Sequence, residues 1–111
     1  MMFVTGPLFS GKRRFVKNRF GWTEEELQRN AVLDAQLLAA SAEDLETLAA
    51  VLAEYPVVIS VEIGGGVVPT DREQREAREK AGRLACLLAE RADTVVRLCC
   101  GLPEVLKGEL P

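Results

Sequence analysis

The order of apolar and polar residues predicts strands that alternate with helices along the chain. Short apolar runs at residues 2–5, 57–61 and 94–100 predict strands. The run at 57–61 is rich in β-branched residues and has no polar alternation, which is typical of a strand buried on both faces of a parallel sheet. Helical stretches separate these runs. The pattern therefore predicts an α/β domain with a mainly parallel sheet.

Helices are expected from about residue 11 to 20, from Thr23 onwards, from residue 41 to 55, and from Thr70 to about Ala92. Two of them have a capping signal at the start. Thr23 is followed three residues later by Glu26, and Thr70 by Glu73. Each pair has the form of a capping box, in which the hydroxyl and the carboxylate accept hydrogen bonds from the free amides of the first turn.

Two segments are less clearly patterned. Residues 30–39 are compatible with a strand, through the pair Val32 and Leu33, and with a helix, through the spacing of Leu33 and Leu37. Both alternatives stay open, because short apolar runs do not separate the two states by periodicity. The tail at residues 102–111 is predicted to be a loose end.

Composition limits the classes of function. The chain has 111 residues, of which 48% are hydrophobic, so a single domain spanning residues 1–111 is expected. Its 14 basic and 17 acidic residues give a net charge of -3, which argues against a nucleic-acid partner. There is no histidine. Imidazole chemistry, as a general base, nucleotidyl acceptor or metal ligand, is therefore excluded unless a partner supplies the ring.

The three cysteines, Cys86, Cys99 and Cys100, do not have the spacing of a metal site. We expect them to be small core residues of a protein in a reducing cytoplasm. The first apolar run is interrupted by Gly6 and Pro7, and no segment has the length of a membrane span. A cytoplasmic location without membrane contact is expected.

The strongest local motif lies between the first strand and the first helix. Gly6 and Gly11-Lys12 satisfy the Gly-x-x-x-x-Gly-Lys part of a phosphate-binding loop, with Ser10 inside it. In such loops the backbone amides surround the phosphates and the lysine, here Lys12, contacts the terminal ones. The alternative is a simple glycine turn between a strand and a helix. The motif favours binding of ATP or GTP.

The residue after this lysine is normally Ser or Thr, whose hydroxyl binds Mg²⁺, and here it is Arg13. An arginine cannot bind Mg²⁺, but it can balance phosphate charge directly. The motif thus favours nucleotide or anion binding over metal-assisted transfer. Pro7 also removes one amide from the loop. Five basic residues lie between positions 12 and 19, which fits a helix facing phosphate and also a solvated surface.

Two carboxylates are further candidates. Glu62 lies at the carboxyl end of the strand predicted at 57–61, where ligands bind in open α/β sheets, so it is a candidate catalytic base toward a substrate hydroxyl. A turn or capping carboxylate is its structural alternative. Asp34 is a candidate magnesium-binding acid if residues 32–33 form a strand, and a surface charge if they are helical.

The sequence from residue 57 to 101 resembles the C-terminal half of the adenosylcobinamide kinase/adenosylcobinamide-phosphate guanylyltransferase family of cobalamin biosynthesis. The family has Asn-Glu-Val-Gly-x-Gly-Ile-Val-Pro where this chain has Val61-Glu62 followed by residues 63–69, then Ala-Gly-Arg, here at 81–83, and Ala-Asp, here at 92–93. The opening also resembles the family's Val-Thr-Gly-Gly-x-x-Ser-Gly-Lys-Ser. The resemblance implies a P-loop NTPase-like (RecA-like) fold, reduced in size.

The departures from the family pattern narrow what the resemblance implies. Members are longer, and the segment that they have between the first helix and the position of Trp22, which is absent here, carries a second strand and their guanylylated histidine. Arg13 replaces the family serine, and Val61 and Ala85 replace family asparagines. The resemblance implies at most the kinase half: NTP-dependent phosphorylation of adenosylcobinamide, without guanylyl transfer.

The family resemblance also implies roles for three residues: Lys12 contacts the phosphates, Asp34 binds a metal, and Glu62 lies near the corrinoid or the site of phosphate transfer. A catalytically degenerate nucleotide- or corrinoid-binding regulator is the alternative. Family members assemble through helices, which implies a homo-oligomer.

Overall fold

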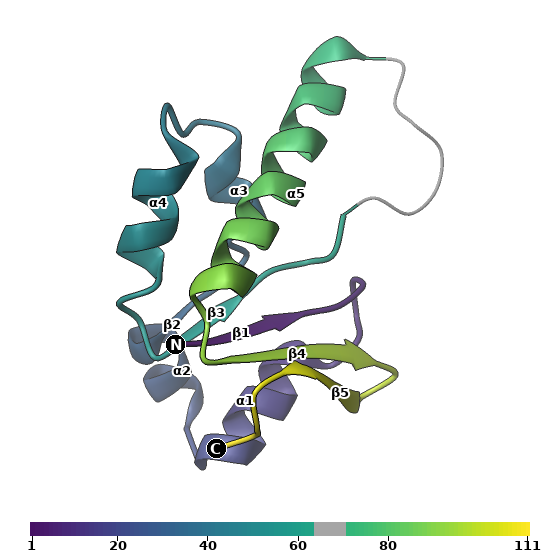
Figure 1. Cartoon of the computed structure of the whole chain (residues 1–111). Helices are drawn as coiled ribbons and strands as arrows, with labels where there is room; N and C mark the ends of the chain where they lie inside the picture. Colours follow the sequence, from purple (N-terminus) through teal and green to yellow (C-terminus); the bar gives the residue numbers. More distant parts are fainter. Residues whose placement is uncertain (64–70) are drawn as a thin grey trace.

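The computed structural model describes residues 1–63 and 71–111, and it contains a five-stranded sheet in the order β2-β3-β1-β4-β5. The strands are β1 (Met2–Thr5), β2 (Ala31–Val32), β3 (Val57–Ile59), β4 (Thr94–Cys99) and β5 (Leu102–Lys107). The first four strands are parallel and β5 pairs antiparallel with β4. The predicted α/β class with a mainly parallel sheet is confirmed, and Figure 1 shows helices on both sides of the sheet.

The helices are α1 (Lys12–Phe20), α2 (Glu24–Asn30), α3 (Gln36–Ala39), α4 (Leu45–Leu52) and α5 (Arg72–Arg91). Alternate strand residues face opposite layers, as the two-residue period of a strand requires. Phe3 and Val58 pack in one core with α3, α4 and α5. Val4 and Ile59 pack in the other with α1 and α2. Figure 1 shows these two layers on opposite faces of the sheet.

Residues 30–39, for which the sequence allowed a strand or a helix, contain one of each. β2 ends at Val32 and α3 begins at Gln36. Between them Asp34 adopts a left-handed backbone with φ of 54°, which ends the strand. The capping box of α2 is confirmed: Thr23 Oγ1 accepts from the amide of Glu26, and a Glu26 carboxylate oxygen accepts from the amide of Thr23.

The capping box predicted at Thr70 lies outside the described residues. In the structure α5 has Asp71 as its N-cap, and the Asp71 carboxylate accepts a hydrogen bond of 2.8 Å from the amide of Glu73. The helix ends at Arg91, one residue before the predicted limit.

The prediction of a loose tail was wrong, because residues 102–107 form β5. Cys100 and Gly101 both have positive φ, 53° and 76°, and they make the two-residue turn that joins antiparallel strands. Cys99 pairs with Leu102 across this turn. The sequence did not indicate this strand for two reasons: Pro103 is unfavourable inside a strand, and every β5 residue is exposed, so no alternation of buried and exposed positions arises.

The predicted core position of the cysteines was also wrong, since all three are exposed. Cys86 is on the solvent side of α5, Cys99 is the last residue of β4, and Cys100 is in the turn. None of the described helices is both long and apolar enough to cross a membrane.

Candidate active site

The loop at residues 6–11 joins the carboxyl end of β1 to the amino end of α1, as the motif predicts. Gly6 has φ of 148° and Gly11, the N-cap of α1, has φ of 90°, so both adopt conformations that favour glycine. A Cβ on Gly6 would lie 2.5 Å from the carbonyl oxygen of Leu98. The loop therefore packs directly against β4 and depends on glycine at this position.

Lys12 is enclosed by this loop. Its residue is only 7% exposed, and Nζ donates hydrogen bonds to Pro7 O at 2.7 Å and to Ser10 Oγ at 3.3 Å. Burial lowers the pKa of the Lys12 ammonium, while the charge of Asp34 opposes this shift. The ammonium group is thus held by the polar atoms of the loop that the motif assigns to phosphate.

Arg13 and Asp34 are brought together by the fold. A terminal guanidinium nitrogen of Arg13 donates to Asp34 Oδ2 at 3.0 Å, and both side chains are partly exposed, at 47% and 39%. Asp34 follows β2, so the carboxylate that the sequence assigned to a metal lies beside the residue that replaces the metal-binding hydroxyl. The sequence predicted neither the contact nor its partner, because 21 residues separate them.

Glu62 is paired with Arg97. The Arg97 Nε and one terminal nitrogen donate to the two carboxylate oxygens at 2.9 and 2.8 Å, a bidentate ion pair between the segment that follows β3 and strand β4. These hydrogen bonds from Arg97 lower the pKa of Glu62. The backbone amide of Glu62 also donates to Gly6 O at 2.7 Å, which ties this residue to the loop. A carboxylate held in this way is a weak proton acceptor.

A cavity of about 420 Å³ lies over the loop and α1. Its charged lining residues are Lys12, Arg13, Arg14 and Asp34, three cations and one carboxylate. This surplus of positive charge favours an anionic ligand. Glu62 does not line this cavity. Glu62 and Thr5 instead line a separate, smaller cavity of about 280 Å³. The structure therefore does not place all the predicted site residues around one cavity.

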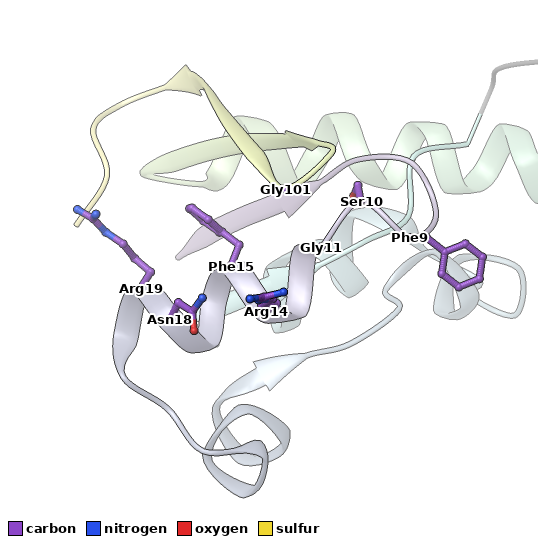
Figure 2. Close-up of a pocket in the computed structure, with 8 residues that line it drawn as sticks. All are labelled: Phe9, Ser10, Gly11, Arg14, Phe15, Asn18, Arg19 and Gly101. Atoms are coloured by element: carbon purple, nitrogen blue, oxygen red, sulfur yellow. The ribbon is translucent and has the colours of Figure 1, made fainter.

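A second cavity, of about 490 Å³, lies on the other side of the loop. It is lined by Phe9, Ser10, Gly11, Arg14, Phe15, Asn18, Arg19 and Gly101. Figure 2 shows Arg14, Asn18 and Arg19 along α1, with the Phe9 ring directed away from them. The amide of Gly101 donates to Ser10 O at 2.9 Å and fixes the β4–β5 turn to the loop. This cavity was not predicted from the sequence, because the β4–β5 turn with Gly101 that borders it was not predicted.

The magnesium site that the fold class implies does not fit the residues present. Mg²⁺ prefers an octahedron of oxygen ligands. Arg13 offers none, and Asp34 is already engaged by the Arg13 guanidinium. Within residues 1–63 and 71–111 there is no group of three or more acidic or cysteine residues placed to hold a metal. No step involving a metal is assigned to this site.

The parallel sheet and the glycine loop before α1 define an α/β domain of the P-loop NTPase-like class. The model of the family described as cobinamide kinase/cobinamide phosphate guanyltransferase (CobU) matches residues 20–106, and the chain belongs to this family. The match includes Asp34, Glu62 and Arg97 but not the loop, so the family assignment and the loop motif are independent observations. No curated protein gave a significant match to the chain.

Proposed function

We propose that this chain binds a nucleoside triphosphate, ATP or GTP, with its phosphates on the loop at residues 6–13. The observation that carries this proposal is the buried ammonium of Lys12, which hydrogen-bonds to loop oxygens at the mouth of a cavity with a net positive lining. The neutral oxygens of Pro7 and Ser10 compensate the buried positive charge of Lys12 only in part. A bound phosphate would supply the full opposite charge. The amino end of α1 adds its partial positive charge.

The second cavity is our candidate for the nucleoside. It shares four lining residues with the first cavity, Phe9, Ser10, Gly11 and Arg14, so the two cavities border the same part of the loop. Its lining combines the Phe15 ring with the Asn18 amide, an apolar surface and a polar group of the kinds that bind a base.

Phosphoryl transfer to adenosylcobinamide is the second candidate function, favoured by family membership and by Glu62, three residues beyond the carboxyl end of β3. In that reaction the substrate hydroxyl oxygen bonds to the γ-phosphorus, the bond to the β–γ bridging oxygen breaks, and the hydroxyl proton passes to Glu62. The ion pair with Arg97 makes Glu62 a weak acceptor, so we expect this activity to be slow or absent.

Guanylyl transfer through a histidine intermediate is not proposed, because the chain contains no histidine. Homo-oligomer formation and binding of a corrinoid stay proposals that follow from the family.

Isothermal titration calorimetry with ATP and with GTP tests the first proposal. We expect saturable binding of at least one nucleotide to the wild type, and a loss of at least about tenfold in affinity in Lys12→Met, which keeps most of the unbranched side chain and removes the charge. Arg29→Met, a change of the same charge on α2, is the control. No binding to the wild type, or equal binding to Lys12→Met, would contradict the proposal.

A separate assay tests the second candidate. Protein, nucleotide and adenosylcobinamide are incubated, and phosphorylated product is measured by mass spectrometry. Product that disappears in Lys12→Met assigns the kinase activity, and its absence in a protein that binds nucleotide supports the non-catalytic alternative.

A further inference from the structure

We propose that the Arg13 guanidinium, oriented by Asp34, takes the place of the magnesium ion, so that the ligand of this loop is a metal-free nucleoside triphosphate. This inference rests on the proposed function and specifies the form of its ligand. It assigns to Arg13 the role of a fixed counter-ion and to Asp34 the role of a positioning residue.

The position of Arg13 carries the first part of the inference. Arg13 is the second residue of α1, next to Lys12, and both side chains line the cavity of about 420 Å³ above the loop. The Asp34 carboxylate holds one terminal guanidinium nitrogen at 3.0 Å. Asp34 is itself fixed by a left-handed backbone, with φ of 54°, directly after β2. The ion pair thus orients the Arg13 guanidinium at the edge of the cavity, where the side chain is still partly exposed to water.

The hydrogen-bonding capacity of Arg13 carries the second part. A guanidinium has five N–H donors in a planar fork that matches the oxygens of a phosphate. The structure records one hydrogen bond from Arg13 to another described residue, the bond to Asp34. Donors on the other nitrogens therefore stay available to phosphate oxygens, while the bond to Asp34 is kept.

Competition for Asp34 carries the third part. A magnesium ion at this carboxylate would have to displace the guanidinium and would then lie close to two further cations of the cavity, Lys12 and Arg14. Both interactions oppose metal binding by charge repulsion. Arg13 also stands where phosphate-binding loops normally have the Ser or Thr hydroxyl that binds Mg²⁺. In this site the positive charge of the Arg13 side chain therefore takes the place of the divalent ion.

The test is the affinity for ATP and GTP measured by calorimetry in EDTA and again in excess Mg²⁺. For the wild type we expect affinity in EDTA equal to or higher than that in Mg²⁺, because the metal competes for the nucleotide. In Arg13→Ser we expect weaker binding in EDTA and a gain of at least about fivefold on adding Mg²⁺, since the hydroxyl and the freed Asp34 then form a metal site. Arg13→Ser with Asp34→Asn should lose that gain.

Arg14→Ser is the matched control, because it removes the same charge from the same cavity without touching Asp34. It should weaken binding in both conditions and leave the response to Mg²⁺ as in the wild type. Arg13→Lys, which keeps the charge, covers the case in which Arg13→Ser does not fold, and it should also bind without Mg²⁺.

Two results would overturn the inference while leaving the proposed function intact: wild-type binding that requires Mg²⁺, or an Arg13→Ser variant that folds, binds nucleotide and gains nothing from the metal. Failure of the wild type to bind in either condition would instead overturn the proposed function, and this inference with it.

Discussion

At the scale of single residues, several features that are unfavourable for the free energy of folding lie around the loop at residues 6–11. Lys12 is buried with its charge, Phe9 is 94% exposed and has φ of 61°, and Asp34 has φ of 54°. A non-glycine residue in the left-handed region costs on the order of 1 kcal/mol. Such costs are typical of sites that natural selection keeps for binding. We therefore expect changes here to separate stability from function.

Lys12→Met should show this separation. Burial lowers the pKa of Lys12, so its charged form is disfavoured in the folded protein. Removing it should leave the free energy of unfolding unchanged or raise it by up to about 1 kcal/mol, while nucleotide binding is lost. Urea unfolding of both proteins measures the change. A loss of more than about 2 kcal/mol would show instead that Lys12 serves the fold.

Gly6→Ala should destabilise the protein more than a change at another left-handed glycine. The new methyl group would meet the Leu98 carbonyl oxygen, whereas a Cβ on Gly21, with φ of 68°, meets no atom within 4 Å. We expect Gly21→Ala to cost about 1 kcal/mol from strain alone and Gly6→Ala to cost about 1–3 kcal/mol more. Equal losses in urea unfolding would contradict the close packing of the loop on β4.

At the scale of elements, local signals predicted most of the fold. The buried strand β3 (Val57–Ile59), predicted at 57–61, follows from an apolar run, and the helix after Thr23 follows from a capping box that satisfies free amides. Strand β5 was not predicted, because its residues are all exposed and its pairing with β4 is set by the turn at Cys100 and Gly101. Strand pairing at an edge depends on the neighbouring strand rather than on a pattern within the strand itself.

The capping box of α2 gives a prediction at this scale. Thr23→Ala removes the acceptor of the Glu26 amide, and it should lower the free energy of unfolding by about 1 kcal/mol. Thr23→Ser keeps the hydroxyl and should restore most of the loss. Chemical denaturation measures both variants. If alanine and serine behave alike, the hydroxyl does not stabilise the start of this helix.

At the scale of the whole molecule, the site is made by contacts between distant parts of the chain. The loop motif, including Lys12, was visible in the sequence because its spacing is local. The pairs Arg13–Asp34 and Glu62–Arg97 join residues 21 and 35 positions apart, and no periodicity indicates such partners. In the fold, both candidate functional carboxylates are ion-paired, Asp34 with Arg13 and Glu62 with Arg97. These ion pairs weaken Asp34 as a metal ligand and Glu62 as a proton acceptor, which agrees with the expectation from Arg13 that the loop favours anion binding over metal-assisted transfer.

Ion pairs also set the dependence of stability on pH. The pKa of Glu62 is lowered in the folded state by Arg97, and those of Glu24 and Asp93 are lowered by Lys17 and by the terminal amine. Carboxylates with lowered pKa stabilise the fold above their unfolded values, near 4.5 for Glu, and this contribution is lost as the pH falls through the folded values. The free energy of unfolding should therefore fall below about pH 4.5.

Glu62→Gln removes one of these groups, so its unfolding free energy should decline less steeply with acid than that of the wild type. Glu54→Gln, at an exposed position on the loop after α4, is the control and should follow the wild-type curve. Urea unfolding between pH 6 and pH 3 gives the slopes. Stability that is constant or rises toward low pH would contradict the sign of these shifts.

The most direct test of the central claim, that this chain binds a nucleoside triphosphate through its glycine loop, is a titration of isotope-labelled protein with ATP and with GTP, followed by amide NMR. We expect saturable shifts of the amides of Ser10, Gly11, Lys12 and Arg13, with a smaller shift at Gly101, and with α4 unaffected. Absence of saturable shifts with either nucleotide, or shifts confined to elements away from the loop, would contradict the claim.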